Sequence, residues 1–195
     1  MRTISILFVA TLAVACGKKD SDKKGGEGGG GTAATDVSAV NAAVPKELAG
    51  KLQFEAAKGE KDRFSFAAPR GWKAGVMPGS YQPPDDANFG FMTRYSVSTN
   101  CDGDCSAKDW AAVTDKVEFA QLTGGDFTVD KDEKADGSRF VVARSSDGSV
   151  VVAAAWWKKD APHYVYCRAK LDGEAAKAAA AFDKACRSVS ISSWD

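Results

Sequence analysis

Residues 136–173, DGSRFVVARSSDGSVVVAAAWWKKDAPHYVYCRAKLDG, decide the fold of this chain. The Asp-Gly pairs at 136–137 and 147–148 are signals for tight hairpin turns, and the Ala-Pro pair at 161–162 breaks the chain again. The stretches between these breaks are rich in β-branched and aromatic residues, which predicts consecutive antiparallel strands. Because residues 150–155 are apolar at every position, their strand is expected to be central and covered on both faces.

The segments on either side of this meander predict more strands and two helices. Strands are expected at 64–68, 89–99, 127–131 and 188–192, with a loop at 77–88. One helix is expected from a cap at Ser106 to Leu122, and an alanine-rich helix at 174–185. Runs of strands with both helices on one side predict an α+β fold, an antiparallel β-sheet flanked by two helices.

The first fifteen residues have the pattern of a targeting segment. Arg2 precedes an uncharged apolar run at 4–15, which is shorter than the roughly 20 residues of a membrane-spanning helix. This pattern is typical of a secretory signal peptide. Residues 12–16, LAVAC, resemble the lipobox of bacterial lipoproteins, and this resemblance implies lipidation of Cys16 at the start of the mature chain. An ordinary signal peptide with an incidental cysteine is the alternative.

Composition divides the rest of the chain into two parts. Residues 16–44 combine KKDSDKK and GGEGGGG with small polar residues, so they are expected to form a disordered, flexible tether. Residues 45–195 are expected to form a single globular domain. The lipid would anchor the exported chain to the bacterial membrane, and the domain would lie in the periplasm or at the cell surface. Gly17 after Cys16, in place of Asp, favours the outer membrane.

The charged residues exclude some classes of function. The chain has 26 Lys and Arg against 26 Asp and Glu, which argues against binding nucleic acid through bulk charge. The single histidine excludes a metal site with several histidine ligands. No glycine-rich phosphate loop, catalytic serine elbow or zinc-binding helix motif is present. No cofactor and no metal ion are therefore expected.

Four cysteines remain after Cys16, an even number that suits disulfides in an oxidising compartment. The expected bridges are local, Cys101 with Cys105 and Cys167 with Cys186. A metal site at residues 101–105, built from two thiolates and nearby aspartates, is an alternative, with calcium as a second option. A catalytic thiol would need a partner base, and none is evident for Cys167.

Aromatic residues on the consecutive strands expected at 149–158 and 163–171, the third and fourth of the meander, form a candidate ligand platform. An exposed tryptophan of the pair Trp156 and Trp157, beside Tyr164 or Tyr166 of the next strand, would form an apolar or sugar-binding platform. Adjacent residues on a strand point to opposite faces, so coverage of both tryptophans by helices is the alternative. His163 begins the fourth strand without a visible partner and is expected to be a surface residue rather than an acid–base catalyst.

Two stretches resemble PsbP-like domains. Residues 64–72, FSFAAPRGW, match the F-x-F-x-x-P-x-G-W opening of that family, and residues 181–189, AFDKACRSV, are similar to its final helix and short strand. The resemblance implies a small antiparallel sheet flanked by helices that acts as a non-enzymatic binding or assembly module. We therefore expect no catalytic residues, a protein or small-molecule partner, and attachment to a membrane through Cys16. An envelope enzyme of the hydrolase type and a purely structural envelope protein are the alternatives.

Overall fold

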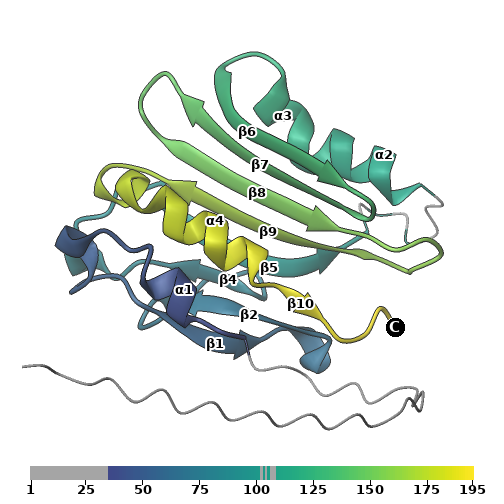
Figure 1. The fold of residues 1–195 in the computed structure, drawn as a ribbon, viewed down its shortest axis with the longest axis horizontal. Helices are drawn as coiled ribbons and strands as arrows, with labels where there is room; N and C mark the ends of the chain where they lie inside the picture. Colours follow the sequence, from purple (N-terminus) through teal and green to yellow (C-terminus); the bar gives the residue numbers. More distant parts are fainter. Residues whose placement is uncertain (1–34, 102, 104, 106–108) are drawn as a thin grey trace, which may run out of the picture. The chain divides into compact units, whose positions relative to one another are not determined.

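The computed structural model describes residues 35–101, 103, 105 and 109–195. The expected signal peptide, Cys16 and residues 16–34 of the expected tether lie outside the described residues. The described chain forms two antiparallel sheets with helices between and beside them (Figure 1). The predicted α+β class is confirmed.

The large sheet has seven strands in the order β3-β4-β5-β9-β8-β7-β6, and the small sheet has the order β1-β2-β10. The strands of the large sheet are β3 (Lys73–Ala74), β4 (Ser80–Gln82), β5 (Arg94–Asn100), β6 (Phe127–Ala135), β7 (Ser138–Ser145), β8 (Val150–Trp156) and β9 (Tyr164–Leu171). Those of the small sheet are β1 (Phe54–Lys58), β2 (Phe64–Pro69) and β10 (Ser190–Ile191). The α-helices are α1 (Ser38–Asn41), α2 (Trp110–Thr114), α3 (Ala120–Thr123) and α4 (Ala179–Arg187).

Shorter helical segments complete the chain. A π-helical turn, η4 (Asp115–Phe119), joins α2 to α3. The remaining turns are the 3-10 segments η1 (Lys46–Leu48), η2 (Glu60–Asp62), η3 (Asp85–Ala87) and η5 (Glu174–Ala178). The predicted helix at 174–185 therefore begins as the 3-10 turn η5 and ends at Arg187.

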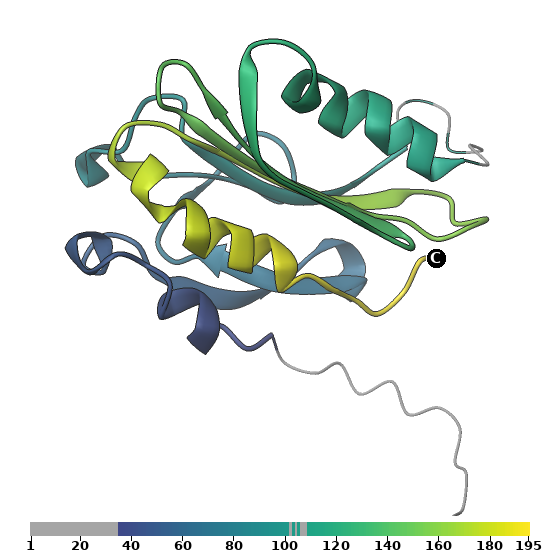
Figure 2. The same ribbon diagram turned by 45° about the horizontal axis from the view of Figure 1, so that its top comes forward.

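Strand β8 is covered on both faces, as its apolar sequence predicts. One face contributes Val150, Val152 and Ala154 to a core shared with α4 and the small sheet. The other face contributes its alternate residues to a second core with Phe119 and Leu122 of the α2–η4–α3 segment. Figure 2 shows α4 on the side of the small sheet and α2 and α3 on the opposite side. The prediction of both helices on one side is wrong, because a strand that is apolar on both faces needs cover on each.

The two stretches that resemble PsbP-like domains meet in the first core. The ring of Phe182 on α4 lies 5.8 Å from Trp72 and 5.2 Å from Phe54. It also lies 5.5 Å from Tyr95, whose hydroxyl donates to the Ala67 carbonyl at 2.9 Å. Strand β10 then pairs antiparallel with β2. The aromatic residues at the two ends of the domain thus close one core between α4 and the two sheets.

The domain begins before residue 45. Val40 of α1 is buried, and the Asn41 side chain bonds both the amide nitrogen of Phe54, at 2.7 Å, and its carbonyl oxygen, at 3.0 Å. The expected tether is therefore wrong for residues 35–44. These residues pack because Val40 fills part of the core and the Asn41 amide bonds the backbone of the edge strand β1.

Several predicted elements differ in their bounds. The strand expected at 89–99 begins only at Arg94, and the loop expected at 77–88 contains β4. Helix α2 is capped by Asp109, which accepts from the Ala112 amide at 3.1 Å, and the expected cap Ser106 lies outside the described residues. The strand expected at 127–131 extends to Ala135 with a bulge between Val129 and Lys131. Its run of charged residues suits an edge strand, where charge opposes pairing with another chain.

Candidate functional site

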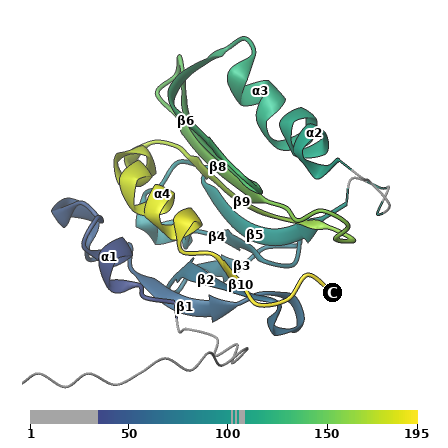
Figure 3. The same cartoon turned by 45° about the vertical axis from the view of Figure 1, so that its right-hand side comes forward.

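One part of the large sheet is open on the face that α2 and α3 cover elsewhere. The α2–η4–α3 segment lies against β6, β7 and β8. The segment reaches β9 at Tyr164, which packs against Trp110 and bonds Glu118, whereas Figure 3 shows no described helix over the same face of β5. We call this surface the basic face. It consists of Arg94, Ser96 and Ser98 of β5 and Tyr166, Arg168 and Lys170 of β9.

Strand alternation and register place these side chains together. The intervening residues Tyr95, Val97, Cys167 and Ala169 all point into the first core, so their neighbours point to the open face. Across the two strands, Arg94 pairs with Lys170, Ser96 with Arg168 and Ser98 with Tyr166. Two cations directly opposite one another on antiparallel strands repel each other and destabilise the pair.

The three cations of the basic face have no ion-pair partner in the described part of the chain. No carboxylate there lies within 4.0 Å of the side-chain nitrogens of Arg94, Arg168 or Lys170. The guanidinium of Arg94 instead donates to the carbonyl oxygens of Phe91, at 2.9 Å, and Thr93, at 2.6 Å. Other arginines of the domain are paired, among them Arg70, Arg139 and Arg187. Arg94, Arg168 and Lys170 therefore lie together, half-exposed and without a direct ion pair. Acidic groups lie nearby, since Ser98 donates to Glu60 at 3.4 Å and the charge of Lys170 adds to hydrogen bonds from Ser149 in lowering the pKa of Asp147.

The other end of the basic face is polar and partly buried. Tyr166 is half-buried, and its pKa is raised by burial and by the nearby Glu118 carboxylate, although a hydrogen bond with Ser96 opposes the shift. Its phenol therefore stays protonated at neutral pH and can donate a hydrogen bond. Glu118, buried on the π-helical turn, accepts from the Tyr164 hydroxyl at 2.8 Å, and the Asn100 amide donates to the same hydroxyl at 2.8 Å. Single π-helical turns of this kind are frequent at functional sites.

The four residues of the predicted ligand platform do not form one surface. Trp156 lies on the α4 side of the sheet with its ring 5.5 Å from Phe140, whereas Trp157 packs against the second core. Tyr164 is fully buried against Trp110 at 5.6 Å. Only Tyr166 belongs to the basic face. The two adjacent tryptophans point to opposite faces, as strand alternation predicts, and both are half-buried, so neither is the exposed tryptophan that the platform requires.

Trp157 instead contributes to a separate hollow of about 450 Å³ beside the start of α2. The hollow is lined by Asp109, Trp110, Ala111, Asp136, Gly137, Trp157, Lys158 and Lys159. Its two acids and two bases balance in charge, in contrast to the basic face.

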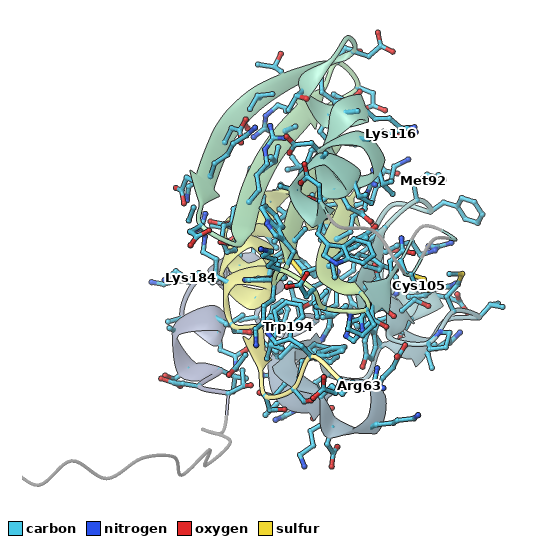
Figure 4. All side chains as sticks on the ribbon, turned by 90° about the vertical axis from the view of Figure 1, so that its right-hand side faces the viewer. Arg63, Met92, Cys105, Lys116, Lys184 and Trp194 are labelled. Atoms are coloured by element: carbon cyan, nitrogen blue, oxygen red, sulfur yellow. A yellow bond between two sulfur atoms is a disulfide. The ribbon has the colours of Figure 1, made fainter. Side chains whose placement is uncertain are left out.

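Both expected cysteine pairs are close enough to form disulfides. The Cα atoms are 4.7 Å apart for Cys101 and Cys105 and 5.5 Å apart for Cys167 and Cys186. The second pair is buried and joins β9 to α4, whereas Cys105 is exposed in the loop after β5 (Figure 4). In the residues that the structure describes, no group of three or more His, Cys, Asp or Glu side chains could hold a metal ion. The aspartates at 102 and 104 lie outside the described residues.

His163 is buried, so the expectation of a surface residue is wrong. The carboxyl-terminal segment covers it, with the Trp194 ring 6.2 Å from the imidazole and the Ser192 amide bonded to the Arg63 carbonyl at 2.8 Å (Figure 4). Burial and the positive charge of Arg63 lower the pKa of His163, against opposing effects of Glu60 and Asp195. The imidazole is therefore neutral at pH 7.

The cations of the basic face were not among the residues singled out from the sequence. A signal exists in β9, where YVYCRAKL alternates between apolar residues and the series Tyr164, Tyr166, Arg168 and Lys170. Arg168 and Lys170 lie on one face near the end of this strand, and two charged side chains on a central strand require that part of the face to contact solvent or a partner. The opposing Arg94 has no such signal, because register across strands is set by the fold.

Comparison with known proteins gives likenesses of structure. No protein-family model matches this sequence, and no curated protein sequence matches it. Among the described residues, no helix is both long and apolar enough to cross a membrane. The domain is similar to the Ran-binding protein Mog1p of Saccharomyces cerevisiae, with 9% identity, a TM-score of 0.48, and 72% of this chain aligned to 96% of that one. It is also similar to cyanobacterial PsbP (CyanoP) of Synechocystis sp. PCC 6803, with 16% identity, a TM-score of 0.41, and 71% of this chain aligned to 92% of that one.

Proposed function

We propose that this protein is a lipid-anchored, non-catalytic binding protein of the bacterial cell envelope whose basic face binds an acidic partner. The observation that carries the proposal is the pairing of Arg94 with Lys170 across β5 and β9, next to Arg168, with no described carboxylate within 4.0 Å. An acidic partner would relieve this repulsion. Complementary charge of this kind also raises the rate and the specificity of association.

The binding test uses a defined acidic probe. A fluorescein-labelled octapeptide of alternating Asp and Thr is titrated into the purified protein at low salt, with anisotropy as the readout. The double variant Arg168→Glu/Lys170→Glu should weaken binding by at least about tenfold, or 1.4 kcal/mol. The matched control, Lys51→Glu/Lys184→Glu, makes the same change in net charge at exposed lysines away from the basic face and should leave affinity unchanged.

Two outcomes would contradict binding at the basic face. One is an equal loss of affinity in both double variants, which would mean that net charge alone attracts the peptide. The other is affinity that does not fall between 50 and 500 mM NaCl, since exposed charges are strongly screened in that range.

The anchor is proposed from the sequence alone, and its support is the resemblance of residues 12–16 to a lipobox. Its test is the intact mass of detergent-extracted protein from a bacterial host, together with cell fractionation. A mass for a chain that starts at Cys16 and carries acyl groups is expected, and Cys16→Ser should release the protein from the membrane fraction. An unmodified, fully soluble wild-type chain would refute the anchor and leave the basic face as a separate question.

A further inference from the structure

An exposed apolar pair borders the basic face. Phe91 is 85% exposed and Met92 is 46% exposed, and both come just before β5. In Figure 4, Met92 lies on the same side of the molecule as Lys116 of the α2–η4–α3 segment, the side on which that segment covers the large sheet. Val76, 99% exposed, lies in the separate turn between β3 and β4 and not in a strand. The apolar surface of Phe91 is thus placed next to unpaired positive charge.

Arg94 connects the apolar pair to the cations. Its guanidinium lies 5.8 Å from the centre of the Phe91 ring and donates to the Phe91 carbonyl. A cation held over an aromatic ring in this way gains stability from the ring's electron density. The ring and the first cation of the basic face therefore form one unit.

The loop that carries Phe91 is fixed to the start of the last helical segment. The Gly90 amide donates to the Asp172 carbonyl at 3.1 Å, and the Thr93 hydroxyl accepts from the Asp172 amide at 3.1 Å. Phe89 also bridges to Gly173. A side chain at Gly90 would collide with that of Asp172, so glycine is required there. The backbone on both sides of Phe91 is thus fixed before any partner arrives, which reduces the entropy lost on binding.

We infer that the partner is an acidic protein segment with an apolar side chain at one end, which packs on Phe91 and Met92 while its acids face Arg94, Lys170 and Arg168. This inference rests on the proposed binding function and names the class of partner. Aromatic residues and arginine are the residue types that dominate protein–protein binding energy, and methionine adapts to varied apolar surfaces. A free anion would use only the cations, whereas a protein segment offers both chemistries side by side.

The spacing of the cations indicates how such a segment would be arranged. Arg168 and Lys170 are two residues apart on β9, which is about 7 Å along a strand. Acidic side chains at every second position of an extended peptide have the same spacing. The apolar side chain would lie beyond the Arg94–Lys170 pair, at the end of β5 where Phe91 is placed.

The test compares two exposed apolar residues with three peptides. Phe91→Ala removes the proposed apolar contact, and Val76→Ala is the matched control because its side chain is at least as exposed. The peptides are the alternating Asp-Thr octapeptide and two versions that carry one added Leu, at the amino or the carboxyl end. One Leu-bearing peptide should bind the wild type about tenfold more tightly than the octapeptide. Phe91→Ala should abolish that gain, and Val76→Ala should keep it.

The outcomes separate this inference from the proposed function. If neither added Leu improves affinity, or if Phe91→Ala and Val76→Ala behave alike, the apolar contact is refuted while charge-dependent binding of the octapeptide still supports the basic face. If none of the peptides binds, the proposed function fails first. Sedimentation with phosphatidylglycerol vesicles is a further arm. Phe91-dependent binding to vesicles, without binding to the peptides, would overturn the inference in favour of a lipid surface.

Discussion

The two cysteine pairs should contribute unequally to stability. Replacing Cys167 and Cys186 with alanine removes a bridge between β9 and α4, the helix that closes the first core. Replacing Cys101 and Cys105 with alanine removes only a loop closure after β5. The two double variants make the same chemical change and serve as controls for each other.

The expected magnitudes follow from loop length and burial. The pairs are separated by 19 and 4 residues, so the chain-entropy model gives about 3 kcal/mol for the first bridge and about 2 kcal/mol for the second. The sulfurs of Cys167 and Cys186 are also buried, so their loss opens a cavity worth about 1 kcal/mol more. We expect the free energy of unfolding to fall by about 4 kcal/mol for Cys167→Ala/Cys186→Ala and by at most about 2 kcal/mol for the other pair.

Urea unfolding at 25 °C without reductant measures the difference, and calorimetry gives a second reading. A loss of about 4 kcal/mol corresponds to a fall in Tm of roughly 8 to 16 °C for a domain of this size. An equal or larger loss in the Cys101→Ala/Cys105→Ala variant would refute the reasoning. Non-reducing peptide mapping that linked Cys101 to Cys186 would refute it as well.

Three further predictions concern single residues of the domain. Burial and Arg63 lower the pKa of His163, so as the pH falls the imidazole is protonated in the unfolded chain before it is protonated in the folded one. The urea midpoint should therefore fall as the pH drops from 7.5 to 5.5, and His163→Phe should reduce this dependence on pH. Arg139 is 5% exposed and donates to Asp132 at 2.7 and 2.9 Å and to Asp115 at 2.7 Å. Arg139→Met should therefore lower the free energy of unfolding by about 2 kcal/mol, less than the loss of one partner from a fully buried ion pair. It should also raise the pKa of Asp132, which NMR titration would follow. Asn41→Ala removes both hydrogen bonds to Phe54 and should lower the free energy of unfolding in urea by about 2 kcal/mol. An unchanged free energy of unfolding would mean that residues 35–44 belong to the tether and not to the folded domain.

The meander was predictable because local chemistry and the final packing agree. The Asp-Gly pairs set the hairpins β6–β7 and β7–β8, and Gly137 and Gly148 have φ angles of 71° and 85° that favour glycine. The uninterrupted apolar run of β8 predicted cover on both faces, and the structure has it. The position of each cover was not predictable, since nothing in a helix sequence states which face of a sheet it will occupy.

The missed elements lack a local signal. Strand β1, FEAAK, buries only Phe54 completely, and β4 has three half-buried residues inside a loop rich in Pro and Gly. Both exist because a neighbouring strand already presents backbone groups to pair with. Within the strand expected at 89–99, alternation places Phe91 on the same face as Tyr95. The bonds of its loop to Asp172 end that alternation before β5 begins.

The missed functional surface has a related cause. Arg94 and Lys170 are 76 positions apart in the sequence, and only the register of β5 with β9 places them side by side. His163 likewise has no partner evident in the sequence, because Trp194, which packs near it, and Arg63, whose charge adds to burial in lowering its pKa, belong to the two ends of the domain. A single sequence shows which residue types are present, but contacts between distant strands come from the fold alone.

The first described residues and the basic face lie on opposite sides of the large sheet. At the start of the described chain, the Thr35 hydroxyl donates to Ser65 of β2, and α1 packs on α4, so this end lies on the small-sheet side of the large sheet. The basic face points the opposite way from the core that α4 and the small sheet share. A partner bound to the cations would therefore not have to displace α1 or the small sheet.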